Sequence, residues 1–250
     1  MKLFARAAVA LSVTLVPSVV LARPYPKELL EDSFASRPVS MMGLMVVMGL
    51  LPFAAVMLTS FSKIAVVLSI CRSALGTQQA PPTVVLTGLA AVLSGHVMAP
   101  VMEQMWTIGE SAYAEVGTGA QMLTAASEVT APLREFLLRH GGAEERAQFV
   151  EMARALRPAE DAQAVTDGDL WVVIPAFVIT ELKEAFQIGF LIFLPFLVLD
   201  MVIANVLLAL GMQTLSPSQV SLPFKILLFV AVDGWALLSK GLILGYGGLS

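Results

Sequence analysis

The chain has 250 residues, of which 57% are hydrophobic and only 14% are charged, and its mean hydropathy is +0.82. Because a soluble domain carries about 25% charged residues, this composition argues against a soluble protein and indicates the membrane class. The formal net charge of −4 argues against a nucleic-acid binder, which would carry a basic patch. Cys71 is the single cysteine, so an intrachain disulfide and a cysteine metal site are excluded.

The N-terminal residues have the layout of a secretory signal. Lys2 and Arg6 precede an apolar run that ends at the small residue Ala22. A basic start, an apolar core and a small-residue cleavage site are typical of a signal peptide, which we expect over residues 1–22. An uncleaved membrane anchor is the alternative. A polar, proline-rich segment follows at 23–38.

Four apolar blocks dominate the rest of the sequence, at 39–71, 83–102, 170–211 and 222–246. A transmembrane helix needs about 20 predominantly apolar residues. Every block contains a proline, which removes a backbone donor, and several carry charges such as Lys63. A charge at mid-bilayer costs about 2.5–3.5 kcal/mol or more. We therefore predict an all-α integral membrane protein of kinked helical hairpins, packed mainly against other protein, with its charges paired.

A different kind of segment separates the second and third blocks. It contains five arginines, no lysine and about twice as many acids, and its apolar residues recur at the spacing of amphipathic helices. Its shortage of lysine agrees with the tendency of basic residues to stay on the cytoplasmic side. We predict two apolar helical blocks at 39–103, a small soluble, extracytoplasmic (periplasmic) helical insert at 104–169, and C-terminal helical hairpins at 170–250.

The third block admits two interpretations. Its apolar start is too short to span a membrane, the charged residues 181–184 follow, and the apolar stretch 188–210 is long enough to span alone. We favour a helix-turn-helix hairpin with its charged part at the bend. A single long kinked helix is the alternative.

Several segments resemble signatures of the FliP/SctR family of type III export proteins. In chain order they are 59–69, 72–79 with Pro81 and Pro82, 97–101, 132–137, 181–190, 194–200, 221–225 and 233–235. The resemblance extends from about Pro52 to Tyr246 at compatible spacing. It implies a core subunit of the type III secretion export gate, a pore in the bacterial inner membrane through which unfolded proteins pass.

The family resemblance also implies partners. Its members form a homo-oligomer, expected to be a pentamer, in a helical complex with FliQ/SctS-like and FliR/SctT-like membrane subunits, partly on the periplasmic side of the inner membrane. An FlhB/SctU-like switch protein and the secreted unfolded proteins are further partners, and no nucleic acid is expected. Segments 205–213 and 237–244 look injectisome-like, whereas the N-terminus and 76–79 look flagellar. We favour the injectisome, and a flagellar FliP-type protein is the alternative.

Candidate working residues follow from the resemblance and from burial of charge. In the family, the loop after the third block carries methionines that close the pore, which here places the gate at Met212, Gln213 and Thr214. Charges in apolar surroundings need partners, and we expect ion pairs between subunits. The candidates for these pairs are Glu181, Lys183, Glu184 and Lys225. Asp200 and Asp233 are predicted to be further buried charges.

Catalysis has little support in the sequence. His96 and His140 are the two histidines, and no nucleophile–base–acid set, phosphate-binding loop or metal-ligand spacing accompanies them. We therefore expect no enzymatic activity, cofactor or metal. A secondary transporter or ion channel is the more distant alternative, because transporters also use interrupted membrane helices with charges at the midplane.

Overall fold

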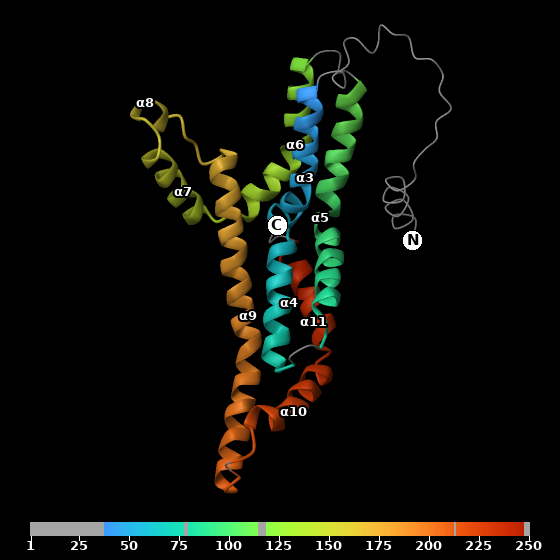
Figure 1. The fold of residues 1–250 in the computed structure, drawn as a ribbon, viewed down its shortest axis with the longest axis vertical. Coiled ribbons are helices and arrows are strands. Elements are labelled where there is room, and N and C mark those ends of the chain that lie inside the picture. Colours follow the sequence, from blue (N-terminus) through green and yellow to red (C-terminus); the bar gives the residue numbers. More distant parts are fainter. Residues whose placement is uncertain (1–37, 78–79, 115–118, 213, 248–250) are drawn as a thin grey trace, which may run out of the picture. The chain divides into compact units, whose positions relative to one another are not determined.

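The computed structural model of the chain describes residues 38–77, 80–114, 119–212 and 214–247, and these residues form helices and no strands (Figure 1). The predicted signal peptide at 1–22 and nearly all of the polar segment at 23–38 lie outside the described residues. The helices of the described part are α3 (Pro38–Met57), α4 (Phe61–Leu75), α5 (Thr83–Ala114), α6 (Gly119–His140), α7 (Ala143–Ala155), α8 (Ala159–Ala162), α9 (Leu170–Ala209), α10 (Pro217–Ala231) and α11 (Gly234–Leu244).

The chain divides into two compact units, residues 1–51 and 52–250. The described residues of the first unit, 38–51, are helical and belong to α3. The second unit contains the rest of α3 and the other helices. Within it α9 contacts α4, α6, α7 and α10, so that α9 is the element on which the second unit is built.

The third apolar block forms one helix, so the favoured hairpin is wrong and the alternative of a single long helix is correct. Helix α9 is continuous for 40 residues and includes Pro175 and Pro195. The charged residues 181–184 do not need a bend, because side chains of α4 and α7 reach them along the helix. The helix that contains the second block is longer than the block itself, since α5 continues to Ala114.

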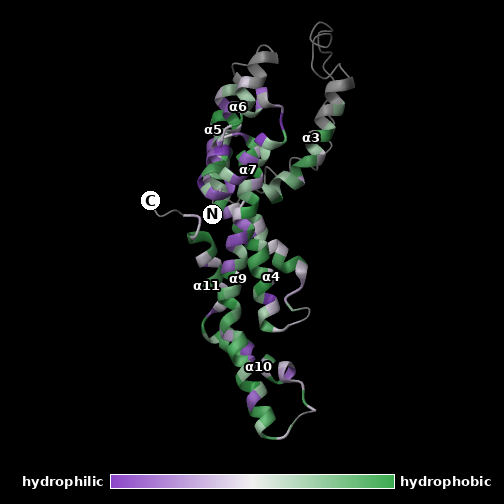
Figure 2. Cartoon of the chain, turned by 90° about the vertical axis from the view of Figure 1, so that its left-hand side faces the viewer, coloured by the Kyte–Doolittle hydropathy of each residue, from purple (hydrophilic) through white to green (hydrophobic). Residues whose placement is uncertain are grey.

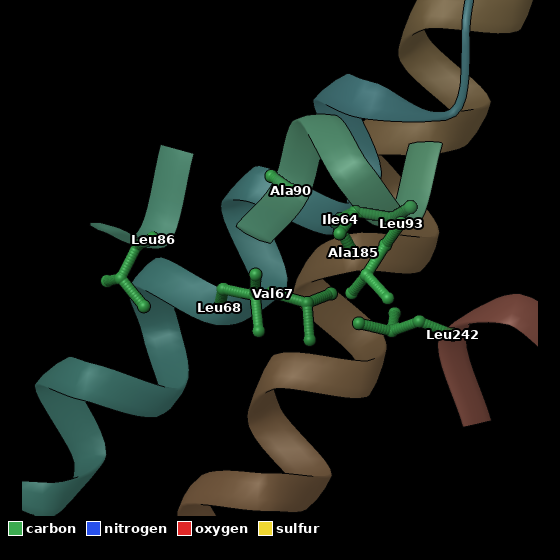
Figure 3. Close-up of a cluster of buried hydrophobic side chains, with 8 residues drawn as sticks. All are labelled: Ile64, Val67, Leu68, Leu86, Ala90, Leu93, Ala185 and Leu242. Atoms are coloured by element: carbon green, nitrogen blue, oxygen red, sulfur yellow. The ribbon is translucent and has the colours of Figure 1, made fainter. Parts of the chain in front are cut away.

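Helix α4 carries the centre of the core. Ile64, Val67, Leu68 and Cys71 are fully buried and recur at the three- and four-residue spacing that gives a helix one apolar face. Figure 3 shows how this face meets neighbours on three other helices. The contributing side chains are Leu86, Ala90 and Leu93 of α5, Ala185 of α9 and Leu242 of α11.

Helices α4 and α9 approach each other closely at Gly189. A Cβ atom at this position would lie 2.5 Å from Cδ1 and 2.9 Å from Cγ2 of Ile70. Ile70 is β-branched and stiff at χ1, so it cannot turn aside without cost. Gly189 therefore permits the spacing at which the charged side chains of α9 meet α4.

The described helices include segments suited to a membrane. Thr83–Ala112 and Leu170–Ala209 are each long and apolar enough to cross one, and two bent pairs pass only together. These pairs are Met48–Met57 with Phe61–Leu75 and Pro217–Ala231 with Gly234–Leu244. Figure 2 shows hydrophobic residues along most of α9 and α10, whereas hydrophilic residues are frequent in α7.

Replacing Gly189 with alanine is expected to weaken the α4–α9 contact. Overpacking of a close contact costs about 1–3 kcal/mol, so Gly189→Ala should lower the midpoint of thermal unfolding of the purified protein in mild detergent. Gly88→Ala is the matched control, because a Cβ at Gly88 meets nothing within 4 Å. An unchanged midpoint in Gly189→Ala would contradict the close approach.

Candidate functional site: two ion clusters and the loop after α9

The first cluster surrounds Lys63 of α4. Its Nζ lies 2.9 Å from Oε1 of Glu181 and 2.6 Å from Oε2 of Glu184. The two glutamates are three residues apart on α9 and therefore project from the same face. Glu181 is 0% exposed, whereas the Glu184 side chain is about half exposed. One buried cation thus joins α4 to two consecutive turns of α9.

Tyr246 closes this cluster from the C-terminal end of the chain. Its hydroxyl donates a hydrogen bond to Oε2 of Glu181, and Lys63 Nζ lies 4.2 Å from the centre of its ring. The ring also stacks on Phe136 and meets His140 edge-on, with centroid distances of 6.0 and 5.0 Å. Burial is the main cause that lowers the pKa of His140, followed by the nearby charge of Lys63. Tyr246 therefore connects α6 to the α4–α9 pair.

A second link joins α9 to the start of α7. Lys183 Nζ lies 2.9 Å from Oε1 of Glu145, and the backbone N–H of Gly142 donates to Oγ1 of Thr180 at 2.8 Å. The hydrogen bond from Lys183 is the main reason that the pKa of Glu145 lies below its ordinary value, with support from the residue's own N–H in the first turn of α7. This link fixes the α6–α7 corner against α9.

The second cluster surrounds Lys225 of α10. Its Nζ contacts Oδ2 of Asp200 at 2.6 Å and donates to the carbonyl oxygen of Ala74 at 3.2 Å. Ser221 Oγ donates to Oδ1 of Asp200 at 2.5 Å. Ala74 belongs to the last turn of α4, where a cation stabilises the partial negative charge of the helix end. Lys225 therefore joins α10, α9 and the C-terminal end of α4.

The predicted candidates for ion pairs between subunits all have partners inside the chain. Glu181 and Glu184 pair with Lys63, Lys183 with Glu145, and Lys225 with Asp200. These intrachain pairs account for the charges of the buried clusters. Contacts of the same residues across a subunit boundary stay a prediction.

The two predicted buried aspartates differ. Asp200 is partly buried and paired with Lys225. Asp233 is exposed at the break between α10 and α11, so its assignment as a buried charge is wrong. Its backbone adopts a left-handed conformation with φ of 51°, and the break places the side chain outside the packed core. An aspartate tolerates this conformation better than most residues.

The loop after α9 is shaped by the backbone of its first residues. Gly211 has φ of +73°, its N–H donates to Leu208, and the N–H of Met212 donates to Leu207 at 2.9 Å. This pair of bonds is a Schellman motif, which ends a helix at a left-handed glycine. Met212 is 47% exposed and Thr214 is also exposed, whereas Gln213 lies outside the described residues.

Several members of these clusters were missed by sequence reasoning. Lys63 was noted as a membrane charge, but its partners were not identified, and Glu145 and Tyr246 were not singled out. The isolation of Lys63 in block 39–71 was a usable signal for a partner on another helix. Tyr246 offered no such signal, since a tyrosine near a helix end fits any interface. The residues that the structure describes contain no group of three His, Cys, Asp or Glu side chains that could hold a metal.

An all-α membrane protein whose long helices are joined by buried ion pairs is the class that this fold and these clusters define. The family model described as "FliP family" matches residues 44–242. The chain therefore belongs to the FliP family.

Relatives named for secretion, translocation and flagellar biosynthesis match most of the chain. It is 47% identical to "Hypersensitivity response secretion protein HrcR" of Ralstonia nicotianae, over 83% of this chain and 96% of the relative. It is 46% identical to "Yop proteins translocation protein R" of Yersinia pestis, over 80% and 92%. "Flagellar biosynthetic protein FliP" of Caulobacter vibrioides is 42% identical, over 83% of this chain and 76% of the relative.

Removing the central cation should destabilise the protein strongly. Lys63→Met leaves the fully buried carboxylate of Glu181 without its cation, and breaking a buried pair in this way costs about 3–5 kcal/mol. We expect a large drop in the thermal unfolding midpoint in detergent, with partial recovery when Glu181→Gln is added.

The exposed pair between Arg139 and Glu135 provides the control. Exposed pairs contribute about 0.2–1 kcal/mol, so Arg139→Met should change the midpoint little. Equal effects of Lys63→Met and Arg139→Met would show that the Lys63 cluster does not hold the helices together.

Proposed function

We propose that the chain is a core subunit of a bacterial type III protein-export gate, which carries unfolded proteins across the inner membrane. The observation that carries the proposal is the 47% identity over 96% of a relative named as a secretion protein. Because the relative matches 83% of this chain and the family model covers residues 44–242, the similarity is not confined to one motif, and the role of the relative transfers more readily than its fold alone would allow.

The injectisome branch is the form of this function that we favour. The two relatives named for secretion or translocation are covered over 96% and 92% of their lengths, whereas the flagellar relative is covered over 76%. Identity is also higher, at 47% and 46% against 42%. A flagellar export protein of the FliP type is the second candidate, supported by that 42% identity.

Assembly with further membrane proteins follows from what the chain leaves uncovered. Large apolar side chains are exposed along α9 and α10, including Phe186, Phe190 and Leu227. The second unit also keeps Lys183 and Glu184 about half exposed. We assign these surfaces to copies of the chain and to FliQ/SctS-like and FliR/SctT-like subunits, because charged positions on a membrane helix favour contact with protein over lipid.

The insert 104–169 is assigned to the periplasmic side of the inner membrane. Its charged residues are five arginines and about twice as many acids, without lysine, which agrees with the positive-inside tendency. The transporter alternative has no comparable support, since the family match covers residues 44–242. The role is structural, as in a conduit, and requires no catalytic group.

Met212 is assigned to the seal of the gate. The Schellman motif holds its backbone at the tip of α9, and its side chain is free to face a neighbour. Methionine is flexible and polarizable and fills irregular gaps. A ring of such side chains from several copies would close a pore to ions by dewetting.

Genetic replacement tests the function. The chain is expressed in Ralstonia nicotianae that lacks HrcR and in Caulobacter vibrioides that lacks FliP. We expect secreted proteins to return to the medium in the first strain, with motility unrestored in the second. Restoration of motility alone would favour the flagellar candidate, and restoration of neither, with the chain present in the membrane, would count against the export function.

Shortening Met212 should open the seal. Met212→Ala removes apolar volume from every copy at once, so we expect cells that express the export complex to leak small ions and dyes while complex levels stay normal. Thr214→Ala is the control, because loss of a polar side chain should matter less. Normal permeability in Met212→Ala would show that another residue seals the pore.

A further inference from the structure

An apolar groove of about 480 Å³ is lined by the end of α4, Ala80 and Pro81 before α5, the first turns of α5, and α10 with the start of α11. Its floor is formed by the nearly buried side chains Leu75, Leu86 and Phe229. Its walls include Val85, Ile226 and Val230, which are exposed. We call it the α5–α10 groove. Pockets that bind small molecules commonly have volumes of about 300–1,000 Å³.

A cation stands beside one end of this groove. Arg72, in the last turn of α4, donates through Nη1 to Oγ1 of Thr83 at 2.9 Å and reaches the carbonyl oxygen of Pro81 at 3.5 Å. Pro81 is itself a wall residue of the groove. Both contacts use one nitrogen of a guanidinium that carries five N–H donors. Among the described residues, no carboxylate forms an ion pair with Arg72.

Helix ends place this cation at the level of a membrane surface. Arg72 ends one apolar helix and Thr83 begins another that is long enough to span a membrane. Long basic side chains at such positions extend toward the headgroups. Basic pockets between membrane helices bind anionic lipid headgroups.

We propose that the α5–α10 groove binds one acyl chain of a membrane phospholipid, with the lipid phosphate at Arg72. The occupant must bring an apolar tail to the groove and a negative charge to its end, and a phospholipid combines both. Arginine binds phosphate through two parallel hydrogen bonds. The lipid bridges the α4–α5 corner and α10, two elements that Lys225 also connects through its hydrogen bond to the carbonyl oxygen of Ala74.

Photocrosslinking tests the groove in the full chain, both purified alone in mild detergent and in the assembled complex. The probe is phosphatidylglycerol with a diazirine in its acyl chain. We expect crosslinks to concentrate in peptides that contain residues 83–89 and 226–235. Val85→Trp, which fills the groove, should abolish them. Val84→Trp should not, because Val84 is its exposed neighbour and does not line the groove.

The charge is tested separately by titrating the probe. Arg72→Gln should weaken apparent binding about tenfold, the effect of one lost charged hydrogen bond, and Arg72→Lys should weaken it less. Thermal unfolding midpoints of all variants report whether the fold is kept.

Three outcomes would overturn the proposal. Equal labelling in Val84→Trp and Val85→Trp, or labelling spread along all exposed apolar helices, would show that the probe reacts from the lipid that surrounds the protein and not from the groove. Groove labelling in the isolated chain that disappears in the assembled complex would mean that another subunit fills the groove. Unchanged binding of the probe in Arg72→Gln would show that the lipid phosphate does not contact Arg72.

Discussion

The ion pair between Lys63 and Glu181 is the constraint on which the arrangement of the helices depends. A fully buried carboxylate has no water to solvate it, and its free energy rises by several kcal/mol unless a cation and hydrogen-bond donors replace that water. Lys63 supplies the cation from α4 and Tyr246 supplies a donor from beyond α11. Neither helix can slide along the other by a turn without separating the charges, so the pair sets the register of α4 on α9.

The apolar core around this pair supplies most of the free energy that holds the helices together, but it does little to fix their register. Leucine, valine and isoleucine faces pack in many registers at similar free energy. Gly189 restricts the possible registers, because it is the one glycine of α9 and its missing Cβ leaves room for Ile70. Lys225 restricts them further by tying α10 to both Asp200 and the end of α4. Side-chain shape and charge together therefore specify the register of the helices, which apolar burial alone does not determine.

Helices could be predicted from the sequence because composition and period report them directly. The apolar blocks, the all-α class and the family signatures were readable in this way. The continuous α9 was not, because residues 181–184 look like a polar bend when their partners are unknown. Those partners, Lys63 and Glu145, lie far away in the sequence, and a local sequence pattern cannot predict a contact with a distant residue.

The candidate site shows the same limit. Six of the charges in the apolar blocks have ion-pair partners within the chain, whereas the sequence pattern suggested partners in other subunits, which stay a prediction. Asp233 was misjudged because its apolar neighbours suggested burial, whereas the left-handed break between α10 and α11 turns it outward. The role of Tyr246 could not be predicted from the sequence, since it arises only when the residue after α11 meets α6 and α9.

The position of Tyr246 also bears on how the protein is made. Synthesis produces α4, α5 and α9 before α11, so Glu181 lacks the Tyr246 hydroxyl while this part of the chain is being made. Its hydrogen-bond donor arrives only after α11 has emerged, and with it the ring that covers Lys63. A chain that ends prematurely therefore keeps a poorly solvated acid inside its helices. The acid that joins α9 to α4 therefore obtains its full set of partners only through a contact that forms after α11 has been made.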